Sequence, residues 1–149
     1  MKVDFYHLGR DPAEKVLAGI ARNTLKAGER LLVVSDDAAQ LGLVSTALWE
    51  ESATSFLAHG RAGSPDDGRQ PILLSGAMEA ANGARYCAIA DGRWREAGAG
   101  GSAFDRVFFL FGEAAVDAAR DCWKALRGRE GLDRRYWAQS PGGKWEQKG

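Results

Sequence analysis

The residues best placed for chemistry form a basic row near the C-terminal end of the sequence. Arg120, Lys124 and Arg127 follow one another at intervals of four and three residues, and Trp123 stands among them. Residues at this spacing lie along one side of an α-helix, so their cationic groups should gather there. Such a helix suits an acidic partner that carries an aromatic group. The row alone leaves open whether that partner is a nucleotide, a nucleic acid or a protein tail.

The distribution of charge supports an anionic partner for this part of the chain. The 20 basic and 20 acidic residues cancel, so no overall field attracts nucleic acid. Residues 1–119 have 12 basic and 16 acidic side chains, whereas residues 120–149 have 8 and 4. The C-terminal end is therefore locally basic, which favours an anionic partner close to it.

An alternation of short apolar runs and helical segments must position this row. The run at 107–111 is too short for a helix and predicts a buried strand that leads into the basic helix. Further strands are expected at 3–8, 30–34, 71–75 and 86–90. Helices are expected after Asp11, which can cap the first one, and after 35–37, where Ser-Asp-Asp offers caps for the second. Gly28 should end the first helix in a left-handed conformation. This order predicts an α/β fold, a three-layer sandwich with a mostly parallel sheet and helices on both faces.

The length predicts one domain over residues 1–149, and the Gly- and charge-rich stretch from about 129 to 149 is interpreted as a surface tail. The sequence lacks a signal peptide and any apolar run long enough to span a membrane, so we expect a cytoplasmic protein without membrane contact. We make no prediction of the role of the glycine-rich loop at 92–102.

Motifs for catalysis or cofactor binding are not found. No P-loop occurs, and the junction after the first strand has one glycine, Gly9, followed by Asp11, which would repel a pyrophosphate. Cys87 and Cys122 stand in unrelated contexts, and no metal-binding spacing involves either histidine. We therefore expect no enzyme activity, no cofactor and no metal. A degenerate nucleotide-dependent enzyme with a Rossmann-like fold is the alternative.

Aromatic residues indicate two further surfaces. Trp49 and Phe56 could form an exposed apolar patch for a protein partner, or pack as ordinary core at the sheet edge. Trp94 and Trp137 stand beside arginines, as in proteins that bind single-stranded nucleic acid directly. Overall neutrality and the lack of a continuous basic groove make this second alternative the weaker one.

The sequence resembles the chi subunit of bacterial DNA polymerase III, an accessory protein of the clamp loader. The resemblance rests on the stretches AGERLLVVSDD, TALWEESATSFLAHG, PILLS, RVFFLFGE and RDCWKALR, which together span most of the chain. Two positions depart from the family pattern: Ala58 replaces the usual proline, and Trp123 stands where tyrosine is frequent. The resemblance implies a nucleotide-binding type of sheet that has no nucleotide site, and a non-catalytic role in DNA replication.

The resemblance also implies a surface for the acidic C-terminal tail of the single-stranded-DNA-binding protein, and so an indirect link to single-stranded DNA. In this view Arg120 pairs with the terminal carboxylate of the tail. Trp123 and Phe109 form the walls of a pocket for its terminal aromatic ring. Lys124 and Arg127 attract the acidic residues upstream.

A second surface implied by the resemblance joins chi to the psi subunit of the clamp loader, where the organism has one. Trp49 and Phe56 match positions of that interface. The two surfaces together would link the clamp loader to the single-stranded-DNA-binding protein.

Overall fold

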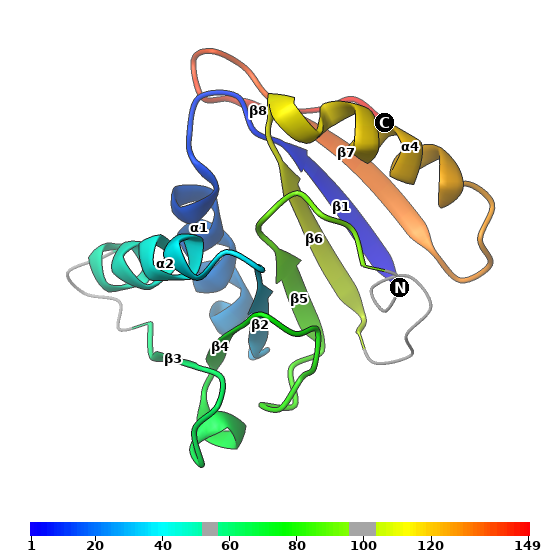
Figure 1. Cartoon of the computed structure of the whole chain (residues 1–149). Coiled ribbons are helices and arrows are strands. Elements are labelled where there is room, and N and C mark those ends of the chain that lie inside the picture. Colours follow the sequence, from blue (N-terminus) through cyan, green and yellow to red (C-terminus); the bar gives the residue numbers. More distant parts are fainter. Residues whose placement is uncertain (52–56, 96–103) are drawn as a thin grey trace.

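The computed structural model describes residues 1–51, 57–95 and 104–149, and these form one mostly parallel sheet with helices on both faces (Figure 1). The strand order is β3-β4-β2-β5-β6-β1-β7-β8, and only β8 runs antiparallel to its neighbour. The strands are β1 (Lys2–His7), β2 (Leu31–Val34), β3 (His59–Arg61), β4 (Ile72–Ser75), β5 (Tyr86–Ile89), β6 (Arg106–Phe111), β7 (Asp133–Gln139) and β8 (Trp145–Gln147). The helices are α1 (Ala13–Lys26), α2 (Ala38–Glu50) and α4 (Val116–Ala125), with 3-10 turns η1 (Asp67–Arg69) and η2 (Glu113–Ala115). The α/β fold expected from the sequence is confirmed.

The two faces of the sheet are covered differently. Successive side chains of a strand point to opposite faces, so Leu31 and Val33 pack under α1 and α2, and Leu32 and Val34 belong to the opposite core. On that opposite face α4 covers β6, β1 and β7 (Figure 1). Among the described residues, no helix is both long and apolar enough to cross a membrane.

The helix boundaries follow local chemistry with one exception. Asp37 caps α2 by accepting a hydrogen bond from the amide of Ala39 at 2.9 Å, and Gly28 adopts the expected left-handed conformation after α1 with φ of 78°. The expected cap by Asp11 is wrong. Pro12 occupies the N-cap position without a side-chain hydrogen bond, and the Asp11 carboxylate accepts from Gln139 Nε2 at 2.8 Å.

The interpretation of residues 129–149 as a surface tail is also wrong, because two strands of the sheet, β7 and β8, lie within them. β7 pairs in parallel with β1 from Asp133 to Ala138, with Phe5 opposite Tyr136, and β8 turns back along β7. In β7, charged residues occupy positions where a strand usually has apolar side chains. Arg135 lies opposite Asp4, and its Nε is 2.9 Å from the fully buried Asp4 carboxylate. An ion pair therefore occupies a position that an apolar side chain would usually fill.

Candidate functional site

The basic row on helix α4 is exposed to solvent, and the opposite side of the helix packs against the sheet. Ala119 and Leu126 are 0% and 1% exposed and pack against the sheet. Arg120, Lys124 and Arg127 are exposed, as their spacing predicts. The amphipathic pattern of α4 is therefore responsible for holding the three cationic groups at the surface.

Trp123 is partly buried between α4 and the strands beneath it. The rings of Phe5 and Tyr136 approach it edge-on, with centroid distances of 5.3 and 5.6 Å. The guanidinium carbon of Arg134 lies 3.8 Å from its ring centroid, and Arg134 also donates a hydrogen bond to the Trp123 carbonyl oxygen. Two residues of β7, Arg134 and Tyr136, therefore join the site. Sequence reasoning missed both because β7 was interpreted as a tail.

The cations near Trp123 form no ion pair with any residue that the structure describes. Within the described ranges, none of the ion pairs involves Arg120, Lys124, Arg127 or Arg134. Partial burial lowers the pKa of Arg134, and the positive charge of Arg127 lowers it further, so the two groups are close enough to repel. We call this set the α4–β7 surface; it comprises Arg120, Trp123, Lys124, Arg127, Arg134 and Tyr136.

Phe109 does not line an open pocket. Its side chain is 1% exposed, and its ring packs against Phe5 and Trp94, each at a centroid distance of 5.4 Å. Phe5 contacts both Phe109 and Trp123 and lies between them. Phe109 therefore supports the surface from within the core, and its expected place in the wall of an open pocket is wrong for this conformation.

The last described residues of the chain lie against Trp123. The Gly149 oxygen accepts a hydrogen bond from the Tyr136 amide at 3.1 Å, and the Lys148 amide donates to the Tyr136 carbonyl oxygen at 2.7 Å. A Cβ atom added to Gly149 would lie 3.1 Å from Cζ2 of Trp123. The C-terminal end, which lies next to α4 in Figure 1, thus covers part of the indole ring.

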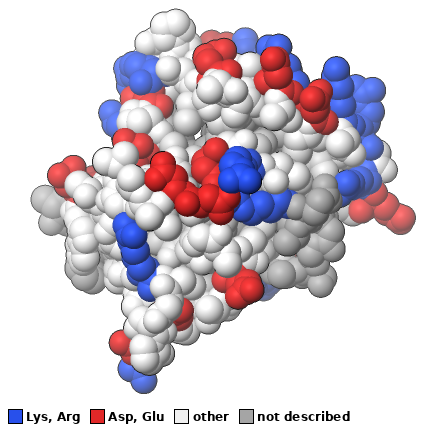
Figure 2. All heavy atoms as spheres, viewed as in Figure 1, with Lys and Arg blue, Asp and Glu red and all other residues white. Residues whose placement is uncertain are grey.

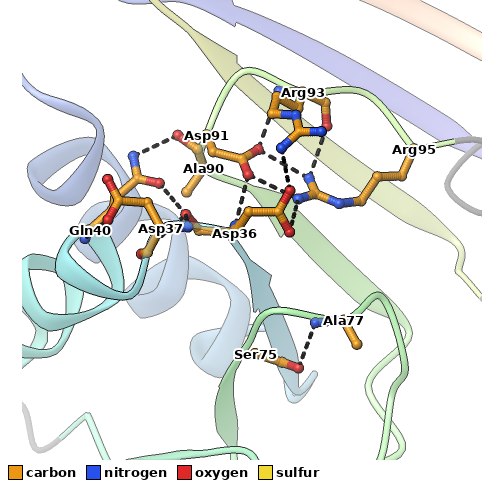
Figure 3. A network of polar contacts seen from close by, with 10 residues as sticks. Asp36, Asp37, Gln40, Ser75, Ala77, Ala90, Asp91, Arg93 and Arg95 are labelled. Carbon is orange, nitrogen blue, oxygen red and sulfur yellow. Dashed lines mark hydrogen bonds and ion pairs between the residues drawn. The ribbon is translucent and has the colours of Figure 1, made fainter.

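A second cluster of charged groups lies where the carboxyl ends of β2 and β5 meet (Figure 3). Arg95 contacts Asp91 at 2.9 Å and Asp36 at 3.2 Å, and Arg93 contacts Asp36 at 2.5 Å. Burial by itself would raise the pKa of Asp91, but hydrogen bonds from Arg95 and from the amides of Asp36 and Arg93 outweigh it and lower that pKa. We call Asp36, Asp91, Arg93 and Arg95 the strand-end network.

This network occupies the crevice where open α/β sheets commonly bind ligands. The chain leaves β2 toward β3 and β4 on one side and leaves β5 toward β6 on the other, so the connections diverge between these two neighbours. Two carboxylates lie there. The Asp36 amide, which could otherwise donate to a phosphate, already donates to the Asp91 carboxylate at 2.9 Å. The arrangement disfavours a nucleotide at this position.

Trp49 lies on the opposite side of the molecule from β7 and is 56% exposed. Its ring is 4.8 Å from that of His59, whose Nε2 and Nδ1 contact Ser45 Oγ and the Leu57 carbonyl oxygen at 2.8 Å each. Leu43, also on α2, is 54% exposed. It was missed, although it departs from the buried stripe of that helix, which is the signal that would have found it. Phe56 lies outside the described residues.

Trp94 and Trp137 belong to opposite faces of the sheet. Trp94 packs on Phe109 in the core on the α4 side, whereas Trp137 lies beside Asp4 on the other face, with its Nε1 3.4 Å from that carboxylate. They cannot act together as one stacking surface for a single strand of nucleic acid.

The space-filling view shows both charged regions. Blue and red side chains lie against each other in the middle of the face, and blue side chains gather at the upper right, toward the end of α4, with red side chains beside them (Figure 2). A model of the family described as DNA polymerase III chi subunit, HolC, matches residues 1–134 of the chain. No curated protein matches it. The matched residues include all of α4 and the first two residues of β7.

Proposed function

The chain belongs to the DNA polymerase III chi subunit family, which places it in DNA replication, and we propose that its α4–β7 surface binds the acidic C-terminal tail of the single-stranded-DNA-binding protein. By this contact it links the polymerase, through the clamp loader, to protein-coated single-stranded DNA. The chain itself has no catalytic role in this proposal.

One observation carries the proposal: Arg134 lies over the partly buried Trp123, three exposed cations follow along α4 and the turn after it, and none of the four forms an ion pair within the described residues. Like charges at this density repel one another, and an acidic ligand relieves the repulsion. Guanidinium groups also bind carboxylates in a two-pronged geometry that the ammonium group of lysine cannot supply.

The positions of the groups suggest how the tail is divided among them. The charge of Arg120 acts on the Tyr136 hydroxyl, and the Tyr136 ring packs against Trp123, so we assign Arg120 the terminal carboxylate. Lys124 and Arg127 continue the same stripe and attract the upstream acids. The aromatic end of the tail takes the edge of Trp123 that Gly149 covers, so the segment around Gly149 moves aside on binding.

We further propose that α2 docks the psi subunit. Trp49 and Leu43 are the large apolar side chains that are most exposed among the described residues, at 56% and 54%. His59 holds the ring of Trp49 in place from beneath and is itself fixed by two hydrogen bonds. An apolar, preorganised patch of this kind suits a protein partner.

A labelled acidic peptide that ends in phenylalanine tests the tail site by fluorescence anisotropy. We expect Arg120→Glu to weaken binding by about 30-fold or more, because it removes one attraction and adds a repulsion. Arg69→Glu is the matched control, since Arg69 is an exposed residue of η1, beside the β3–β4 edge of the sheet. Equal binding by wild type and Arg120→Glu would falsify the site. An equal loss in both variants would mean that the peptide senses only net charge.

A further inference from the structure

A line of polar side chains leads from the α4–β7 surface to the carboxyl end of β1. The charge of Arg120 opposes the rise that burial causes in the pKa of Tyr136, so its guanidinium group lies near that hydroxyl. The Tyr136 hydroxyl lies 3.3 Å from His7 Nδ1, and His7 Nε2 lies 2.8 Å from Glu113 Oε1. The four residues come from α4, β7, β1 and η2, so only the tertiary structure brings them together.

The chemistry of the two ends determines the direction of the outer contacts, and the protonation of His7 determines the direction of the middle one. A guanidinium group only donates and a carboxylate only accepts. Arg120 therefore faces the Tyr136 oxygen as a donor, and protonated Nε2 of His7 donates to Glu113. When Nδ1 of His7 has no proton, the Tyr136 hydroxyl donates to it. In this state His7 is neutral, and the Tyr136 hydroxyl donates its hydrogen bond to His7 and not to a ligand.

We propose that Tyr136 and His7 are positioning residues of the tail site and make it a carboxylate site that takes up a proton with its ligand. When His7 binds a proton from water at Nδ1, that nitrogen becomes a donor to the Tyr136 oxygen. The Tyr136 hydroxyl then loses its acceptor and turns its own proton toward the ligand carboxylate beside Arg120. The inference rests on the proposed function of the α4–β7 surface and names the chemistry that recognises the end of the tail.

Groups from four other elements surround His7. Glu113 of η2 is 82% exposed and pairs with the imidazole, whose side chain is 18% exposed. The ring of Phe111 on β6 stacks against His7 at 5.2 Å, and Tyr136 faces it from β7, with Arg120 of α4 beyond. Burial raises the pKa of Tyr136 while Arg120 lowers it, and the net rise keeps the hydroxyl protonated at neutral pH.

The test is the affinity of the labelled acidic peptide ending in phenylalanine, measured at about pH 6 and about pH 8 at constant ionic strength, where imidazole is the side chain that ordinarily changes charge. We expect wild type to bind about fivefold more tightly at the lower pH, because the complex gains one hydrogen bond to a charged group. His7→Gln keeps a donor and an acceptor but does not titrate, so its affinity should not vary with pH. His59→Gln removes the one other histidine of the sequence and should keep the wild-type dependence.

Tyr136→Phe is the second variant, and it removes only a hydroxyl group. It should abolish the pH dependence and weaken binding at the higher pH by about threefold, because Arg120 loses the partner that orients it. A pH dependence that persists in His7→Gln, or its absence from wild type, overturns the inference. The proposed function fails separately, if Arg120→Glu binds the peptide as well as wild type does.

Discussion

The strand-end network and the α4–β7 surface are built from similar residues and differ in how their charges are compensated. In the network, Asp36 and Asp91 accept contacts from Arg93 and Arg95, so the charges are balanced inside the cluster. On the α4–β7 surface, none of the ion pairs among described residues reaches the four cations. The comparison shows that similar residues are paired with one another in one region and left without ion pairs among the described residues in the other.

Burial explains why the two clusters serve different purposes. The side chains of Asp91 and Arg95 are 9% and 19% exposed, so their pair is shielded from water and joins the segments that follow β2 and β5. Arg120, Lys124 and Arg127 are exposed and remain hydrated until a partner arrives. The first arrangement stabilises the fold, and the second is suited to binding.

The largest effect on stability should come from Asp91→Ala. It leaves Arg95 without its closest partner and removes the acceptor of two backbone amides. We expect the free energy of unfolding, measured with urea, to fall by about 2 kcal/mol, while peptide affinity stays unchanged. Arg93→Ala is the control: its side chain is 71% exposed, so the change should stay within about 0.5 kcal/mol. A loss of peptide affinity in Asp91→Ala would contradict the separation of the two regions.

The lowered pKa of Asp91 predicts that the free energy of unfolding depends on pH. A carboxyl group whose pKa is lower in the folded state stabilises the fold above its unfolded pKa, and this contribution disappears as the pH falls through the folded value. The pKa of Asp91 is lowered, so its contribution should be complete at about pH 5 and decline below about pH 4. Urea unfolding of Asp91→Asn should show a weaker loss of stability over this range than wild type.

Arg134→Ala should act mainly on binding. The substitution removes one of the four cations and the guanidinium group that lies over Trp123. We expect peptide affinity to fall about tenfold and the free energy of unfolding to fall by about 1 kcal/mol. Arg134→Lys separates the two effects, because it keeps the charge and loses the planar group. Unchanged affinity in Arg134→Ala would remove β7 from the site.

Salt should distinguish the two regions without any substitution. Exposed cations are screened efficiently, so raising the salt concentration from about 50 mM to about 200 mM should weaken peptide binding by about fivefold. The partly buried strand-end network is screened less, and the free energy of unfolding should change little. Salt-independent binding would show that the cations of α4 do not contribute.

The smallest effect concerns the segment that covers Trp123. Lys148→Pro removes the amide that donates to the Tyr136 carbonyl oxygen and should loosen the segment around Gly149. Peptide affinity should rise by about threefold, because less of the covering contact must be broken. Lys148→Ala keeps the amide and serves as the control. Weaker binding by the proline variant would show that this segment is part of the site.

Sequence reasoning recovered the elements whose apolar residues follow a regular period. The runs in β2, β4, β5 and β6 predicted buried strands, and the spacing of α4 placed its cations on an exposed side. It failed for β7, where Arg135 pairs with the buried Asp4 of another strand. A residue whose burial depends on a distant partner shows no local hydrophobic pattern, so its strand was interpreted as a tail.

The sequence by itself determined the α/β order, the basic row on α4 and the resemblance that led to the family. The tertiary structure decided which cations are unpaired, that Arg134 and Tyr136 join Trp123, and that Phe109 is enclosed in the core. The physical reason is that charge compensation and exposure depend on contacts between strands far apart in the chain. The spacing of residues along one helix cannot report those contacts.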